Sequence, residues 1–265
     1  MWYIFRSLPN FFGVWDKIIL KERGIIMTYV MSDLHGDYEN LLKMLQMIEF
    51  SDEDILYILG DSCDRGENAS GIYLDLIERK NVVHLMGNHE KMALDALASI
   101  VNIDISDEEK SSKEIHESVP LEIWMENGGE DTLLSFKNLN NEQLCSIVFY
   151  MNAMPYFAEI EVNGREFVLV HAGFETFSPE KSLEDYEKRE LIWARYDYDK
   201  NFYQEENKKV IVGHTPTFVI NRWERPAKIY HGKGDVIAID CGSVYRDCGG
   251  RLACLRLDDM KEFYV

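Results

Sequence analysis

MTYVMSDLHGD, at residues 27–37, begins as an apolar run and ends as a polar one. The apolar part, taken from residue 25 to residue 31, predicts the first strand of the core. Asp33 and His35 stand two residues apart just after it, so in extended backbone their side chains point the same way. A carboxylate and an imidazole that leave one strand end together can bind one metal ion. Gly36 then lets the chain turn away.

Two further apolar stretches end in similar polar clusters. The stretch 54–59 leads into GDSCDRG at residues 60–66, and the stretch 82–86 leads into GNHE at residues 87–90. Helices are expected between the strands, at 38–48 and at 71–79 with Ser70 as the N-cap. This alternation predicts a largely parallel sheet, and ligands bind at the carboxyl ends of such strands. We therefore expect the polar clusters to meet at one sheet edge.

The second half of the chain is expected to be richer in strands. Residues 91–150 look helical and carry many charges at 104–117, which indicates an insertion with a solvated face and not a separate catalytic domain. Asn163-Gly164 between two alternating runs, 156–162 and 165–170, predicts a hairpin. Later elements are expected as strands at 209–212, 236–240 and 251–257 and a helix at 183–193. The fold class we predict is α/β, with two mixed sheets packed face to face and helices on both flanks.

Four of the seven histidines stand at strand ends. Besides His35 and His89, His171 closes the hairpin and His214 closes a later strand in VGHTP. Imidazoles in these positions are candidate metal ligands or proton carriers. The remaining three are interpreted differently: His84 as a core residue, His116 as solvated in the acidic insertion, and His231 as part of a Gly-rich loop away from the site.

The charge balance excludes several classes of function. The formal net charge of -19 repels nucleic-acid backbones and anionic membranes, so neither is expected as a partner. An anionic phosphorylated substrate then needs local positive charge, which bound metal ions supply. Five scattered cysteines without a CxxC pair indicate a reducing, cytoplasmic location. No apolar run is long enough to span a bilayer, and the sequence does not indicate the oligomeric state.

Residues 1–26 are expected to be an N-terminal extension, with the core domain covering 27–265. Met27 opens the first predicted strand, which fits an upstream start codon. The alternative, equally open, is that these residues form a helix or strand packed on the domain surface.

Taken in order, the polar clusters resemble the motifs of the calcineurin-like metallophosphoesterases, and more narrowly the bacterial and phage branch of the PPP-type serine/threonine protein phosphatases. The matching segments are DLHG at 33–36, GDxxDRG at 60–66, GNHE at 87–90, HAG at 171–173 and GHTP at 213–216. The match runs from about Met27 to Asp240, with 91–150 poorly matched. The resemblance implies a four-layer sandwich of two mixed sheets with flanking helices.

The resemblance also implies roles for individual residues. The first metal would be held by Asp33 and His35. Asp61 would bridge both metals. Asn88, His171 and His214 would complete the second. Arg65 and Arg195 would bind the phosphate, and His89, oriented by Asp64, would be the general acid.

The expected reaction is the hydrolysis of phosphomonoesters, most specifically phosphoserine and phosphothreonine in proteins. A hydroxide bridging two divalent metals would attack phosphorus, and His89 would protonate the leaving group. Oxygen and nitrogen ligands without thiolate suit Mn²⁺, Fe or Zn²⁺, and the resemblance favours Mn²⁺. The substrate would be a phosphorylated protein or a small phosphoester.

Two departures and two alternatives accompany this reading. Ser62-Cys63 replaces a bulkier pair usual in that motif, and Cys241 stands where relatives often have Thr, but neither change removes a ligand.

One alternative is a symmetrical dinucleoside tetraphosphate hydrolase, whose third motif usually ends in Asp where this chain has Glu90. The other is an inactive metal-binding scaffold. The segment 91–150 and the loop 174–190 are expected to shape the approach to the site.

Overall fold

The computed structural model describes residues 26–101 and 118–265. Within them the chain forms two five-stranded sheets, with the strand orders β10-β9-β1-β2-β3 (sheet A) and β4-β5-β6-β8-β7 (sheet B). The strands of sheet A are β1 (Thr28–Met31), β2 (Ile55–Ile58), β3 (Val82–His84), β9 (Ala253–Arg256) and β10 (Lys261–Tyr264). Those of sheet B are β4 (Phe157–Val162), β5 (Arg165–Val170), β6 (Lys208–Val212), β7 (Tyr230–His231) and β8 (Val236–Ala238).

Both sheets are mixed, as the sequence predicted. β1, β2 and β3 run parallel, while β9 pairs antiparallel with β1 and β10. In sheet B, β5, β6 and β8 run parallel, and β4 and β7 join antiparallel at the edges. The short strands β7 and β10 were not expected from the sequence, because neither carries a continuous apolar run.

The core lies between the two sheets. Val30 of β1 belongs to the same buried cluster as Leu169 of β5 and Ile211 of β6. Its neighbours Tyr29 and Met31 belong to a second cluster on the opposite face of sheet A. This alternation follows from the two-residue period of a strand, and it places helices on the outer face of the sheet.

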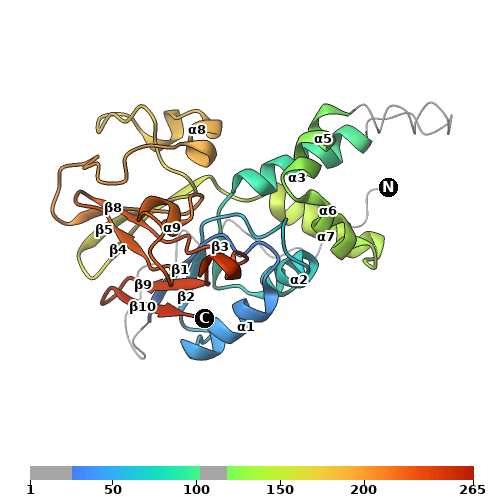
Figure 1. Cartoon of the computed structure of the whole chain (residues 1–265), viewed down its shortest axis with the longest axis horizontal. Helices are drawn as coiled ribbons and strands as arrows, with labels where there is room; N and C mark the ends of the chain where they lie inside the picture. Colours follow the sequence, from blue (N-terminus) through green and yellow to red (C-terminus); the bar gives the residue numbers. More distant parts are fainter. Residues whose placement is uncertain (1–25, 102–117) are drawn as a thin grey trace.

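Helices α1 (Tyr38–Met47) and α2 (Ala69–Glu78) cover that outer face of sheet A, while α8 (Lys188–Trp193) and the loops around it cover sheet B (Figure 1). The predicted N-cap of α2 is wrong. Asn68, and not Ser70, caps the helix by accepting a hydrogen bond from Gly71 N at 2.9 Å. Ser70 lies inside the first turn, so its backbone is already helical.

The hairpin between β4 and β5 is confirmed with its turn. Val162 pairs with Arg165, and Asn163 and Gly164 between them have φ values of 52° and 78°. Positive φ at both central residues is what a two-residue hairpin of type I′ requires. The helix expected at 183–193 is interrupted: a single 3₁₀ turn, Leu183–Asp185, precedes α8.

The segment expected as a helical insertion contains four described helices, α3 (Asn88–Val101), α5 (Val119–Glu126), α6 (Gly129–Phe136) and α7 (Asn141–Asn152). They form a group to one side of the sheets (Figure 1) and bury Trp124, Ile147 and Met151 against Tyr73 of α2. His116 lies outside the described residues. Within the described residues, no helix is both long and apolar enough to cross a membrane.

Candidate metal centre and phosphate site

The loops after β1 and β2 lie against each other at the carboxyl edge of sheet A. Asp33 N donates to Gly60 O at 3.1 Å, and His35 N donates to Asp61 O at 2.8 Å. A Cβ atom on Gly66 would lie 2.0 Å from the His35 carbonyl oxygen. Since no side chain fits there, this glycine lets the two loops approach and brings their polar side chains together.

The reason expected for the convergence of Asp33 and His35 is wrong. The two residues are not extended: their φ values are 53° and 44°, and Asp61 has 56°. Non-glycine residues in the left-handed region cost about 1–3 kcal/mol each and persist only where the surroundings fix them. The backbone turns at each of these residues, and Asp33 Oδ1 still comes to 4.0 Å from His35 Nε2.

Asp61 is the centre of the cluster. Its Oδ2 atom lies 3.4 Å from His171 Nε2 and 3.9 Å from Nε2 of both His35 and His89. Asp61 therefore belongs to two groups of candidate ligands, one with His35 and His89 and one with His171 and His214. Within each group the ligand atoms lie within 4.8 Å of one another. A carboxylate shared by two ligand groups can hold two neighbouring cations, as in two-metal sites.

The two remaining predicted ligands lie beside these groups. Asn88 Oδ1 is 2.9 Å from His171 Nε2. Asp33 has one partnered and one unpartnered oxygen: Oδ2 accepts from His214 N at 2.9 Å and from Ser32 Oγ, whereas Oδ1 is buried without a partner. The structure thus brings together all six residues expected to bind metal.

The donor atoms fit divalent cations. His35 Nδ1 donates to the Cys63 carbonyl at 2.8 Å, and His171 Nδ1 donates to the Leu59 carbonyl at 2.6 Å. Because a carbonyl only accepts, the proton sits on Nδ1 and Nε2 faces the cluster. The buried atoms Asp33 Oδ1 and His214 Nε2 have no protein partner. Buried polar atoms without partners are costly, and a cation bound beside each of them would satisfy it.

Burial and charge set the protonation of the ligands in the cation-free chain. Burial lowers the pKa of His214 to about 3 and that of His35 well below its usual value, so both rings are neutral. Burial raises the pKa of Asp33 to about 7. For His171, burial acts to lower the pKa, but the Asp61 carboxylate outweighs it and raises the pKa to about 9.

His89 forms a pair with Asp64. Its Nδ1 donates to Asp64 Oδ2 at 2.6 Å, which turns Nε2 toward the cluster. The guanidinium of Arg65 contacts two of the imidazoles. Its Nη1 is 2.7 Å from His35 Nε2, and its Nη2 is 2.7 Å from His89 Nε2. His89 and the guanidinium of Arg65 therefore stand beside the candidate ligands. The ring of Tyr245 lies 5.9 Å from the Arg65 carbon Cζ.

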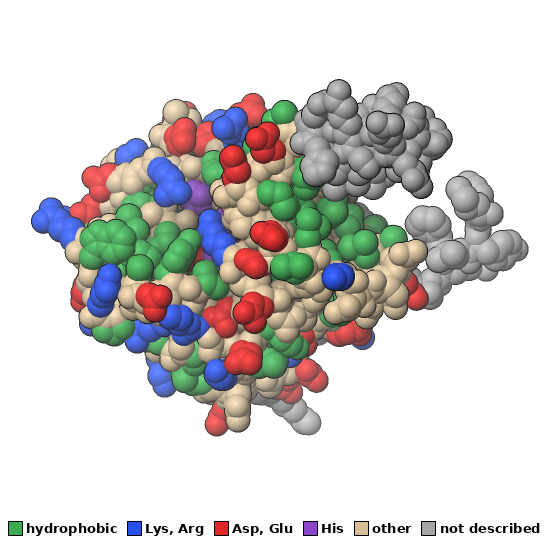
Figure 2. Space-filling model, turned by 45° about the vertical axis from the view of Figure 1, so that its right-hand side comes forward, with side chains coloured by type: hydrophobic (Ala, Val, Ile, Leu, Met, Phe, Trp, Pro, Cys, Tyr) green, Lys and Arg blue, Asp and Glu red, His purple; other side chains and the backbone are tan. Residues whose placement is uncertain are grey.

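Arg195 approaches from sheet B. It follows α8, is exposed, and donates from Nη1 to Thr215 Oγ1 at 2.9 Å. Thr215 directly follows the candidate ligand His214, so this hydrogen bond holds the Arg195 guanidinium beside the cluster. On the face shown in Figure 2, histidine atoms are visible beside Lys or Arg side chains, while acidic side chains are spread widely.

Glu90 does not face the cluster. Its carboxylate is fully buried and accepts from the backbone N–H groups of Asp61, Ser62 and Gly87 at 2.8, 2.6 and 3.1 Å, and from the Tyr73 hydroxyl at 2.9 Å. This carboxylate fixes the backbone at two motif loops. Because it is enclosed by protein, it has no direct contact with a substrate.

Other sequence expectations concern residues near the cluster. His84 is buried and bonded to Ser62 Oγ at 3.0 Å, and burial lowers its pKa to about 3, which agrees with a core role. Cys63 is fully buried. His231 is exposed and lies 2.8 Å from Glu262, outside the cluster.

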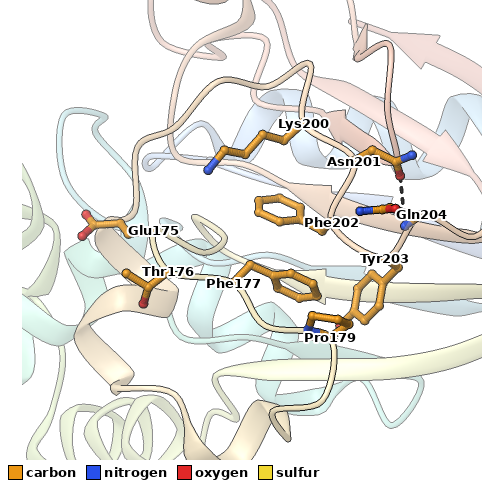
Figure 3. Close-up of a pocket in the computed structure, with 9 residues that line it drawn as sticks. All are labelled: Glu175, Thr176, Phe177, Pro179, Lys200, Asn201, Phe202, Tyr203 and Gln204. Carbon is orange, nitrogen blue, oxygen red and sulfur yellow. Dashed lines mark hydrogen bonds between the residues drawn. The ribbon is translucent and has the colours of Figure 1, made fainter.

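Part of the loop 174–190, which is expected to shape the approach to the site, lines a pocket of its own. Phe177 meets Phe202 and Tyr203 there, beside Lys200 (Figure 3). None of the candidate ligands lines this pocket.

Sequence reasoning missed two side chains of the site, Trp124 and Thr132. Trp124 Nε1 donates to both carboxylate oxygens of Asp64, at 2.9 and 3.0 Å, and Thr132 Oγ1 donates to Asp64 Oδ1 at 2.7 Å. Both stand in the poorly matched segment. A tryptophan and a threonine in amphipathic helices carry no local signal of such a contact.

The fold and this geometry agree with comparisons to known proteins. The chain belongs to the calcineurin-like phosphoesterases, whose family model matches residues 26–243. Serine/threonine-protein phosphatase 2 of Salmonella typhimurium is 29% identical over 173 residues, 63% of this chain and 67% of that protein. The symmetrical bis(5'-nucleosyl)-tetraphosphatase of Salmonella paratyphi B is 36% identical over 75 residues, 28% of this chain and 27% of that protein.

A solved protein serine/threonine phosphatase from Saccharomyces cerevisiae shares the fold, with a TM-score of 0.56 at 14% identity, over 91% of this chain and 79% of that chain. The predicted family, fold class and enzyme class are confirmed: the chain is a metal-dependent phosphoester hydrolase.

Proposed function

We propose that this enzyme hydrolyses phosphomonoesters, in particular phosphoserine and phosphothreonine in proteins. The observation that supports this most is the position of Asp61, whose Oδ2 lies within 4 Å of three imidazole nitrogens from both sheets. The extent of similarity supports the substrate class. The match to a serine/threonine phosphatase covers 173 residues, whereas the match to a dinucleoside tetraphosphatase covers 75.

In this proposal two divalent cations, most simply Mn²⁺, occupy the cluster. Asp33, His35 and Asp61 hold one, and Asp61, Asn88, His171 and His214 hold the other. When bound, such cations act as Lewis acids and lower the pKa of a water molecule toward neutrality. His89 is close enough to His35 to reach the first position. Its Nδ1, however, is bonded to a carboxylate, Asp64, whereas His35 Nδ1 is bonded to a backbone carbonyl. Because a paired carboxylate suits a proton donor, we assign His89 to proton transfer.

The protein side chains then complete the hydrolysis. Arg65 and Arg195 bind the phosphoryl oxygens and stabilise the charge that develops on them. The oxygen of water forms a bond to phosphorus while the bond from phosphorus to the leaving oxygen breaks. The attacking water loses one proton to solvent. Once Arg65 has turned from His89 Nε2 to the phosphate and Nε2 has taken up a proton, His89 donates that proton to the leaving oxygen, which departs as an alcohol. The products are the free alcohol and inorganic phosphate, and no covalent phosphoenzyme forms.

A second candidate is the hydrolysis of symmetrical dinucleoside tetraphosphates, favoured by the 36% identity of the shorter match. In the sequence, Glu90 is the residue that favours phosphomonoesters over dinucleoside tetraphosphates. Because its side chain is buried, it can influence substrate choice only through the loops it fixes. Turnover of a phosphoserine peptide and of diadenosine tetraphosphate, both with Mn²⁺, separates the two. We expect faster release of phosphate from the peptide, and preferential cleavage of diadenosine tetraphosphate would contradict the proposal.

A further inference from the structure

The helical segment between α3 and β4 reaches the Asp64–His89 pair. Thr132 of α6 makes a reciprocal contact: its hydroxyl accepts from Asp64 N at 2.7 Å and donates to Asp64 Oδ1 at 2.7 Å. Trp124 of α5 donates from Nε1 to both carboxylate oxygens. All three side chains are fully buried, so water does not compete for these hydrogen bonds.

These donors fix the direction of the Asp64 carboxylate. Oδ1 accepts from Thr132 and Trp124, and Oδ2 accepts from Trp124 and from His89 Nδ1. Rotation of the carboxylate would break several charge-assisted hydrogen bonds at once, and such bonds are the stronger kind. The ring of His89 is therefore oriented by a carboxylate that two helices hold in place.

The same helices also fix the backbone of the phosphate-binding loop. Asp64 and Arg65 both have φ of 67°, a conformation that non-glycine residues rarely adopt without support. Arg65 N donates to the carbonyl of Gly128, in the turn between α5 and α6, at 3.1 Å. The insertion thus supports two adjacent residues with proposed roles in the reaction, Asp64 through Thr132 of α6 and Arg65 through the turn at Gly128.

We propose that Trp124 and Thr132 are positioning residues of the hydrolysis, and that they act by holding Asp64 against His89. This rests on the proposed function, in which His89 donates a proton to the leaving oxygen. An acid contributes most when the leaving group is poor. Loss of either contact should therefore slow the hydrolysis of alkyl phosphates more than that of aryl phosphates, a pattern that a purely structural role does not produce.

The test compares Thr132→Val, which keeps the shape but removes the hydroxyl, with Thr132→Ser, which keeps the hydroxyl. The full chain loaded with Mn²⁺ is assayed on a phosphoserine peptide and on 4-nitrophenyl phosphate. We expect Thr132→Val to lower kcat on the peptide by about tenfold or more, the usual scale for such supporting contacts. KM should change little, the loss on 4-nitrophenyl phosphate should be much smaller, and Thr132→Ser should stay near the parent.

Trp124→Phe removes the N–H from the other helix and should reproduce the same substrate pattern. Phe136→Leu is the matched control, because Phe136 belongs to the same buried cluster and none of the contacts described to Asp64 comes from it. That substitution should leave the ratio of the two kcat values unchanged. Thermal unfolding of each variant confirms that the assayed protein is folded.

A double variant separates this inference from the proposed acid. In a His89→Ala background, Thr132→Val should add no further loss, because its effect passes through His89. Equal losses on both substrates, or a full additional loss in that background, would overturn the positioning role. A His89→Ala enzyme as fast as the parent on the peptide would overturn the acid itself. A slow His89→Ala enzyme with unaltered Thr132→Val would overturn the positioning role alone.

Discussion

Asp61 follows a strand of sheet A and His171 follows a strand of sheet B, yet Asp61 Oδ2 and His171 Nε2 lie 3.4 Å apart. The candidate metal centre is therefore formed by both sheets together. The carboxyl ends of β1, β2, β5 and β6 meet there, so the packing of one sheet on the other determines the ligand geometry. A substitution that shifts one sheet against the other should therefore weaken metal binding even where each sheet stays folded.

Metal affinity should rise with pH. In the cation-free chain the pKa of His171 is raised to about 9 and that of Asp33 to about 7, so both groups carry protons that a cation must displace. Below pH 9 the apparent Mn²⁺ affinity should increase by up to about tenfold per pH unit, and more steeply below pH 7.

Calorimetric Mn²⁺ titrations in buffers of different ionisation enthalpy measure both the affinity and the protons released. Proton release should be larger at acid pH than above pH 9. An affinity that does not change with pH would contradict the protonation we describe for His171.

Removal of the proposed acid should have a selective effect. His89→Ala should lower kcat on a phosphoserine peptide by about 10²- to 10⁴-fold, with a smaller loss on 4-nitrophenyl phosphate because its leaving group needs less protonation. Metal content, measured by elemental analysis, should be unchanged. His231→Ala is the control, since His231 is exposed outside the cluster, and this variant should keep the activity of the parent.

Arg65 should not be replaceable by lysine. Its two terminal nitrogens each lie 2.7 Å from a different imidazole, and a single ammonium group cannot reproduce that fork. Arg65→Lys should lower kcat/KM by about 10²- to 10³-fold, the scale for losing one donor to transition-state charge. Arg256→Lys, at a surface pair with Asp259, should change kcat/KM less than about twofold. Similar values for the two variants would argue against a phosphate-binding role for Arg65.

Glu90 should act on stability and not directly on substrate choice. Glu90→Asp shortens a carboxylate that accepts from three backbone N–H groups. Leaving such buried donors unsatisfied costs about 1–3 kcal/mol, which denaturant unfolding would detect. The ratio of activities on a phosphoserine peptide and diadenosine tetraphosphate should stay the same. A shift of that ratio toward the dinucleotide would restore Glu90 as a determinant of specificity.

The convergence of the candidate ligands could be predicted from the sequence because each of them directly follows an apolar run or stands in a short motif beside one. The carboxyl ends of parallel strands share one edge, so residues such as Asp61 and Asn88 had to meet. The local geometry could not be predicted in the same way. Asp33 and His35 converge through left-handed backbone that is fixed by hydrogen bonds from a neighbouring loop, and a strand pattern does not encode such contacts.

The roles of Trp124 and Thr132 could not be predicted for a different reason. Their contacts with Asp64 span 60 and 68 residues and depend on how α5 and α6 fold over α2. The apolar spacing of these helices predicts burial but not which polar atom meets the buried N–H and hydroxyl. The sequence therefore indicated an insertion that shapes the approach, whereas the structure places its side chains on the partner of the proposed acid.

In the proposed function Asp61 is shared by two metal ions that support phosphoester hydrolysis. The measurement that tests it most directly is the number of Mn²⁺ ions bound per chain in the parent and in Asp61→Ala, determined together with phosphate release from a phosphoserine peptide. The parent should bind two ions and release phosphate only when Mn²⁺ is present, and Asp61→Ala should lose both properties. Metal-independent release, or an Asp61→Ala enzyme that keeps both ions and its activity, would contradict the claim.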